Sequence, residues 1–196
     1  RIESRGLGDV YKRQTKNLPS FIKERLEAGG INSINPVVDI LNYVMLDLGQ
    51  PMHAFDLNKI GKQINVRFAK SKEKIHLLDE SSKILNDKCL VISDEKEPLA
   101  FAGIMGGIKS SVSATTDSVF IESAFFAPNI IRGKARNFNI QTDSSQRFER
   151  GVDYNLQSLA LVKATNLIKE YLSGTYSKIS TVETKSNLPR QKLIDL

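Results

Sequence analysis

The stretch VFIESAF, residues 119–125, predicts a β-strand and belongs to a block of short strands that decides the fold class. Alternate side chains of a strand share one face, so Phe120, Glu122 and Ala124 lie together. A carboxylate between two apolar neighbours must be paired, reach solvent in a cleft, or meet a ligand. A strand whose Glu122 face simply looks at water is equally compatible with these residues.

Strands and helices are predicted on both sides of this stretch. Further runs rich in β-branched, aromatic or other apolar residues predict strands over residues 64–69, 75–78, 89–93, 99–102 and 179–183. The order of helices, a block of strands and then a long helix predicts an α+β fold, with helices packed against a mostly antiparallel sheet system.

Three helices carry start and stop signals. Ser20 can cap a helix over residues 21–28 that ends at two glycines. Asn35, the proline after it and Gly49 delimit a second helix over residues 36–48. The longest helix is expected over residues 154–173, between an aspartate and a glycine.

The two ends of the chain differ from the rest. Residues 1–14 show neither helical nor strand periodicity, so we expect a tail that is disordered or foreign to the natural gene, and we leave it out of the fold. Residues 191–196 begin like another strand. We therefore expect one domain over residues 15–190, a piece of a longer chain.

Composition excludes several classes of protein. The chain has 196 residues, a net charge of +6 and a pI near 9.4, which suits a polyanionic partner without proving one. It has no apolar run of about 20 residues and no secretory signal, so we expect a soluble cytoplasmic protein with no membrane contact. One cysteine, Cys89, and two histidines, His53 and His76, are too few for a disulfide or a zinc site of histidine and thiolate, so no metal is expected.

A histidine and an asparagine are candidates for chemistry. His53 is the last residue of a compact turn, residues 49–53, after the second helix, and Asn42 lies in line with Val38 and Met45 on that helix. His53 and Asn42 can face one cavity only if the chain doubles back. A loop histidine satisfied by a backbone carbonyl is the commoner case.

Two other segments give weaker signals. Residues 99–107, LAFAGIMGG, contain three glycines that allow close approach of a ligand, but no nucleotide-loop spacing. A basic run with interleaved aromatic residues could bind phosphates, although such runs are more often solvated or paired with local acids. The cations of this run are Arg132, Lys134, Arg136, Arg147 and Arg150.

Four motifs in order carry a family resemblance. They are NPVVDILNYVMLDLGQPMHAFD (residues 35–56), LAFAGIMGG (99–107), ESAFFAP (122–128) and TDSSQRFERGVD (142–153). Residues 18–196 closely resemble the beta subunit of bacterial-type phenylalanyl-tRNA synthetase. The region resembles its paired third and fourth domains, a helix-flanked, β-rich composite editing domain.

The resemblance implies hydrolysis of tyrosine wrongly esterified to the 3′ adenosine of the phenylalanine tRNA. A hydrophobic pocket rejects an isostere with one added hydroxyl by only about a hundredfold, so a second site must select for that hydroxyl. Glu122 matches the position that recognises the tyrosine phenol, and Asn42 and His53 match catalytic positions at the ester end. Positions matching the wall beside the amino acid are Ala102, Gly103 and Gly106.

Two positions depart from the family pattern. Leu41 stands where a threonine often precedes the asparagine, which removes a hydroxyl from the ester end. Ser144 stands where alanine is common, and it could add a polar contact near the phenol or narrow the pocket. The basic run either holds the tRNA end or is general surface charge.

The resemblance also implies partners. The 3′ end of the phenylalanine tRNA and an alpha subunit are expected, in a heterotetramer of two alpha and two beta subunits. No cofactor is expected in this chain, because ATP and magnesium would belong to the alpha-subunit active site. The alternatives are a scaffold domain that binds tRNA or the alpha subunit without hydrolysis, and a freestanding deacylase.

Overall fold

The computed structural model describes residues 2–7, 18–177 and 179–183, and it confirms the α+β fold with antiparallel sheets. The helices are α1 (Ser20–Ala28), α2 (Pro36–Leu48), α3 (Pro128–Ile131), α4 (Lys134–Asn137), α5 (Asp143–Arg150) and α6 (Leu156–Leu172), with a 3-10 turn at Leu57–Lys59. The strands are β1 (Ile2–Leu7), β2 (Met52–Asp56), β3 (Asn65–Phe68), β4 (Lys74–His76), β5 (Ser82–Ile84), β6 (Leu90–Ser93), β7 (Pro98–Phe101), β8 (Met105–Gly106), β9 (Val119–Ala124) and β10 (Ile179–Val182).

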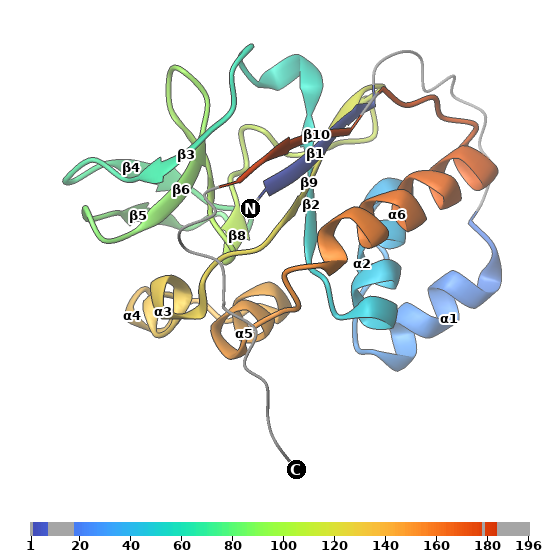
Figure 1. Ribbon diagram of the computed structural model, residues 1–196, viewed down its shortest axis with the longest axis horizontal. Coiled ribbons are helices and arrows are strands. Elements are labelled where there is room, and N and C mark those ends of the chain that lie inside the picture. Colours follow the sequence, from blue (N-terminus) through green and yellow to red (C-terminus); the bar gives the residue numbers. More distant parts are fainter. Residues whose placement is uncertain (1, 8–17, 178, 184–196) are drawn as a thin grey trace, which may run out of the picture.

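Two four-stranded antiparallel sheets form the centre of the molecule. Sheet A has the strand order β10-β1-β9-β2, sheet B has the order β3-β6-β7-β8, and β4 pairs with β5 in a separate ribbon. Helices α1, α2 and α6 lie on one side of sheet A, and sheet B lies on the other (Figure 1). The short helices α3, α4 and α5 lie together on the side of sheet B.

The alternation predicted for β9 sends its two faces into different cores. Ile121 packs with Ala54 and the helices in the helix-side core, as does Val119. Ala124 and Phe120 face the sheet B side, where Phe55 is fully buried. Glu122 shares the face of Phe120 and Ala124, so it points between the two sheets.

The helix signals are confirmed in part. The side chain of Asn35 accepts a hydrogen bond from the Val37 N–H at 3.0 Å, and Gly49 ends α2 with a φ of 76°. Ser20 is the first residue of α1 rather than its cap, and Pro19 stands at the cap position. Helix α6 begins at Leu156, slightly later than expected.

The N-terminal expectation needs a correction. Residues 1–14 were left outside the fold, but Ile2–Leu7 form β1, which pairs with both β9 and β10. Backbone hydrogen bonds on both edges hold such a strand, and these bonds need no apolar periodicity in the sequence. The segment 191–196 lies outside the described residues. No helix in the described part of the chain is long and apolar enough to span a membrane.

Candidate active site

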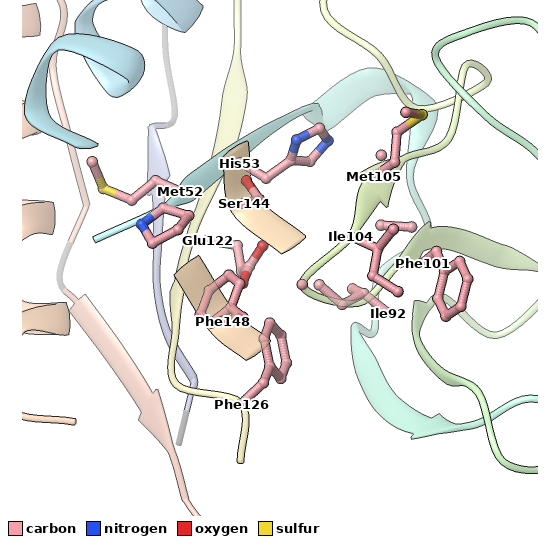
Figure 2. A pocket seen from close by; sticks show the side chains of 14 residues that line it. Met52, His53, Ile92, Phe101, Ile104, Met105, Glu122, Phe126, Ser144 and Phe148 are labelled. Carbon is pink, nitrogen blue, oxygen red and sulfur yellow. The ribbon is translucent and has the colours of Figure 1, made fainter. Parts of the chain in front are cut away.

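A cavity of about 50 Å³ lies where sheet A, the β7–β8 hairpin and α5 meet. Glu122 reaches it from β9 and His53 from β2, while Ile104 and Met105 line it from the hairpin. Figure 2 shows the Glu122 and His53 side chains on one side of this space and Ile104 on the other. His53 and Glu122 meet because β2 pairs antiparallel with β9, with His53 directly opposite Glu122.

Glu122 is an acid in an apolar setting. The residue is 6 % exposed, and Phe126 and Phe148, whose rings meet edge to face with centroids 5.1 Å apart, line the same cavity. Burial raises the pKa of the Glu122 carboxyl to about 8, because the charged form loses its hydration. Within the described residues no hydrogen bond offsets this burial, so the carboxyl is protonated at neutral pH.

His53 lies directly opposite Glu122 in the antiparallel pair of β2 and β9. Its ring meets the Phe55 ring edge to face, with the centroids 4.5 Å apart. The Nε2 atom is buried and has no hydrogen-bond partner in the part of the chain that the structure describes, and burial lowers the pKa of His53 to about 4. The imidazole is therefore neutral at pH 7, and one of its nitrogens is free for a ligand or a water.

The glycine wall predicted from the sequence lines this cavity at Gly103 and Gly106. Gly103 has a φ of +70°, in a turn closed by the Ile104 N–H bonding the Phe101 carbonyl at 2.9 Å. A Cβ on Gly106 would lie 2.3 Å from Cε1 of His53, so only glycine leaves room for that ring. Ala102 is fully buried behind the turn and does not line the cavity.

A side-chain hydrogen bond ties α5 to the same turn. Thr142 caps α5, since its Oγ1 accepts from the Ser145 N–H at 3.0 Å, and the same hydroxyl donates to the Ile104 carbonyl at 2.7 Å. This places Ser144 among the residues that line the cavity.

A buried glutamine fixes the other end of the site. The Gln50 amide donates to the carbonyls of Pro51 and Ala124, both at 2.8 Å, and its oxygen accepts from the Gln157 amide at 2.9 Å. These bonds join the start of β2, the end of β9 and α6, so the strands bearing His53 and Glu122 are held in register.

One predicted catalytic residue, Asn42, is not in the cavity. Asn42 lies half-buried on α2, whose apolar face packs in the helix-side core beyond sheet A, and it is not among the residues lining the cavity. Leu41, at the position where the family pattern often has threonine, is buried in that helix-side core. The structure therefore brings His53 to Glu122 without Asn42.

The basic run lies outside the cavity as well. None of its cations lines it: Arg132, Lys134, Arg136, Arg147 and Arg150. Among the described residues, no three His, Cys, Asp or Glu side chains gather as a metal site would require.

Residues 6–173 match the family model described as the B3/4 domain. The chain belongs to the B3/4 domain family. The resemblance stated from the four motifs is confirmed by close relatives of this B3/4 domain. The phenylalanine–tRNA ligase beta subunit of Coxiella burnetii is 49% identical over 172 residues, which are 88% of this chain and 22% of the relative. The phenylalanine–tRNA ligase beta subunit of Legionella pneumophila (strain Lens) is 53% identical over 171 residues, which are 87% of this chain and 22% of the relative.

A third relative and a solved structure extend the comparison. The beta subunit of Acinetobacter baylyi is 44% identical over 201 residues, covering 100% of this chain and 25% of the relative. The B3/4 domain thus spans about a quarter or less of these relatives. The crystal structure of an N-terminal fragment of the phenylalanyl-tRNA synthetase beta subunit from Pyrococcus horikoshii matches with a TM-score of 0.54 at 13% identity, over 90% of this chain and 46% of that one. At that identity the match shows the fold alone.

The apolar lining of the B3/4 cavity was not predicted from the sequence. Phe126 and Phe148 lie inside motifs that were quoted as family signatures, yet nothing in their local pattern separates a cavity wall from core. The half-buried Met52 and Met105 were missed for the same reason. The sequence offered one signal for the two methionines: each directly precedes a predicted site residue, Met52 before His53 and Met105 before Gly106.

Proposed function

We propose that this B3/4 domain is the editing module of a phenylalanine–tRNA ligase beta subunit and hydrolyses tyrosine esterified to the 3′ adenosine of the phenylalanine tRNA. The observation that carries the proposal is the buried Glu122 carboxyl, which faces a cavity and has no partner among the described residues. The names of the relatives supply the reaction context.

Glu122 is suited to select a phenol over a phenyl ring. A protonated carboxyl can both donate and accept, so it can satisfy a tyrosine hydroxyl from either side. A phenylalanine ring would leave the buried carboxyl unpaired, at a cost of about 1–3 kcal/mol for the polar group. That cost corresponds to a preference of about 5- to 150-fold for the tyrosyl group.

The side chains at the cavity would move when the amino acid enters. A volume of about 50 Å³ holds about one or two water molecules, less than a phenol ring requires. Met52 and Met105 are half-buried and line the cavity, and methionine adapts its shape through three rotatable bonds. We assign these two side chains to opening the cavity for the ring.

His53 is the residue assigned to cleavage. Its neutral imidazole can accept a hydrogen bond from a water at the unpartnered Nε2 and orient that water toward the ester carbonyl. Water then adds to the carbonyl carbon, the bond from that carbon to the ribose oxygen breaks, and the ribose oxygen takes the proton given up by the water and becomes a hydroxyl. Tyrosine leaves as the free acid. Asn42 has no part in this assignment, because it does not line the cavity.

The proposed partners follow from the same assignment. The 3′ end of the phenylalanine tRNA is the substrate carrier, and an alpha subunit with ATP and magnesium would perform aminoacylation. The B3/4 domain itself would work in the cytoplasm and use only water and the residues around Glu122.

The test measures ester loss from tyrosyl and phenylalanyl forms of the phenylalanine tRNA with the purified chain. The tyrosyl ester should be cleaved much faster, Glu122→Ala should remove that preference, and His53→Ala should slow cleavage about 10²–10⁴-fold. Glu24→Ala, an exposed glutamate on α1, is the matched control and should behave as wild type. Equal loss of both esters from wild type would refute hydroxyl recognition, and tRNA binding without hydrolysis would favour the scaffold alternative.

A further inference from the structure

A second hollow lies on the opposite side of α5 from the cavity. This α4–α5 groove has a volume of about 460 Å³ and runs between α4, the segment 139–141 and α5. Ser144 and Phe148 on α5 line the cavity, whereas Ser145, Gln146 and Arg150 line the groove. The two hollows are therefore separated by one helix, a thickness of about 10 Å.

Two unpaired arginines face the groove. Arg136 and Arg150 are exposed, line it, and have no ion-pair or hydrogen-bond partner within the described residues. Two other cations of the basic run are engaged: Arg147 pairs with Asp143 at 3.4 Å, and Arg132 donates to a backbone carbonyl at 3.4 Å. Lys134 does not line the groove. Of the cations in the basic run, only Arg136 and Arg150 therefore bring guanidinium groups without a partner among the described residues to this groove.

The remaining lining is polar. Asn139, Gln141 and Gln146 contribute amides to the groove, and one acid, Glu149, lies there with its carboxylate accepting from the Gly133 N–H at 3.4 Å. Two arginines against one glutamate leave the groove with a net positive charge.

This composition favours a phosphate-bearing ligand over a peptide. No large exposed hydrophobic residue lines the groove, and its apolar members are the buried Ala135 and Ile140. Protein interfaces are enriched in aromatic residues and methionine at their centre, which this groove lacks. Guanidinium groups bind phosphates with paired hydrogen bonds and can stack on bases, and amides bind base edges.

The geometry points to the α4–α5 groove as a binding site for the single-stranded 3′ segment of an RNA, with phosphates at Arg136 and Arg150. The terminal ribose then reaches the cavity across the N-terminal turn of α5, beside Ser144. The identity of this RNA as an aminoacylated tRNA rests on the proposed function. The positive charge of the groove and its binding of a single-stranded RNA do not depend on the proposed function.

The test compares the Arg136→Ala/Arg150→Ala chain with a charge-matched control, Lys23→Ala/Arg25→Ala, which removes two exposed cations from α1. Binding of uncharged phenylalanine tRNA is measured at several salt concentrations. Each phosphate contact to a single strand contributes about −0.7 to the slope of log K against log salt, so the groove variant should lose about 1.4 from that slope. The control should keep the wild-type slope.

A second measurement separates binding from chemistry. A tyrosyl ester of adenosine carries no phosphate, so the groove variant should cleave it at the wild-type rate while its KM for tyrosyl-tRNA rises. Equal salt slopes for the groove variant and the control would overturn the proposal. Equal slopes are also the result expected if the groove binds a protein segment instead of RNA. Loss of adenosine-ester cleavage would also overturn it. If wild type cleaves neither ester, the proposed function fails and the salt slopes still decide the groove.

Discussion

Glu122 and His53 face each other across β9 and β2, and both are neutral at pH 7 because burial penalises their charged forms. The pKa of Glu122 is raised, so the folded state holds a proton that the unfolded chain releases above pH 4.5. Stability therefore falls as pH rises from about 4.5 to about 8. The pKa of His53 is lowered from 6.5 to about 4, so its contribution has the opposite sign and stability rises with pH over that interval.

At this residue scale, we predict that the two contributions oppose each other between pH 4.5 and 6.5 and that Glu122 alone lowers stability between pH 6.5 and 8. Glu122→Gln removes the titration but keeps the size of the side chain. Its stability relative to wild type should grow by about 1.4 kcal/mol per pH unit from pH 5 to 8. Urea unfolding of both chains across this range measures the difference, and parallel profiles would contradict a buried neutral Glu122.

At the scale of elements, Thr142 joins two parts of the cavity wall. Its hydroxyl caps α5 by accepting from Ser145, and it also donates to Ile104 on the turn that carries Gly103. The cap and the link to the turn are separable, because an aspartate can accept at the cap but has no proton to donate when ionised. The capping hydrogen bond stabilises α5, and the link fixes the distance from α5 to the glycine wall.

We predict that Thr142→Asp keeps most of the stability of the chain but lowers the preference for tyrosyl over phenylalanyl ester. Thr142→Val should lose both the cap and the link, with a stability cost of about 1–2 kcal/mol. Thr142→Ser should restore wild-type behaviour. The measurements are thermal unfolding and the ratio of cleavage rates, and a wild-type ratio in Thr142→Asp would rule out the positioning role.

The elements also show how much the sequence could predict. Helix α2 was predictable to the residue because its signals, Asn35 and Gly49, are local. Strand β2 was not predicted, and its first two residues, Met52 and His53, were assigned to a turn, because this short segment carries no periodicity of its own and pairs with the distant β9. Helix α5 has just one apolar side chain, Phe148, so the sequence has no apolar periodicity there that would predict a helix. Glu122 and its apolar strand face were predictable from local alternation. That His53 lies opposite Glu122 was not, because it depends on the long-range pairing of β2 with β9.

On the scale of the whole molecule, sheet A separates two hydrophobic cores, of which, among the described residues, only one contributes its buried side chains to the cavity wall. The helix-side core contains Ile40, which is fully buried and far from the cavity lining. The other core contains Ile92, equally buried, and this side chain lines the cavity. Stability should depend on both cores, whereas selection between esters should depend on one.

The last prediction uses this matched pair of isoleucines. Ile40→Ala and Ile92→Ala remove the same atoms from buried sites, so each should lower the free energy of unfolding by about 2–5 kcal/mol. Ile92→Ala also enlarges the cavity beside Glu122, so a phenyl ring can bind without meeting the carboxyl and the tyrosyl preference should fall. Ile40→Ala should keep the wild-type preference. Denaturant unfolding and both cleavage rates are measured below the melting range, with Ile→Val at each site, which costs about 0.5–1.5 kcal/mol, if the alanine variants do not fold. An equal change of preference at both sites would mean that selection follows overall stability rather than the shape of the wall around Glu122.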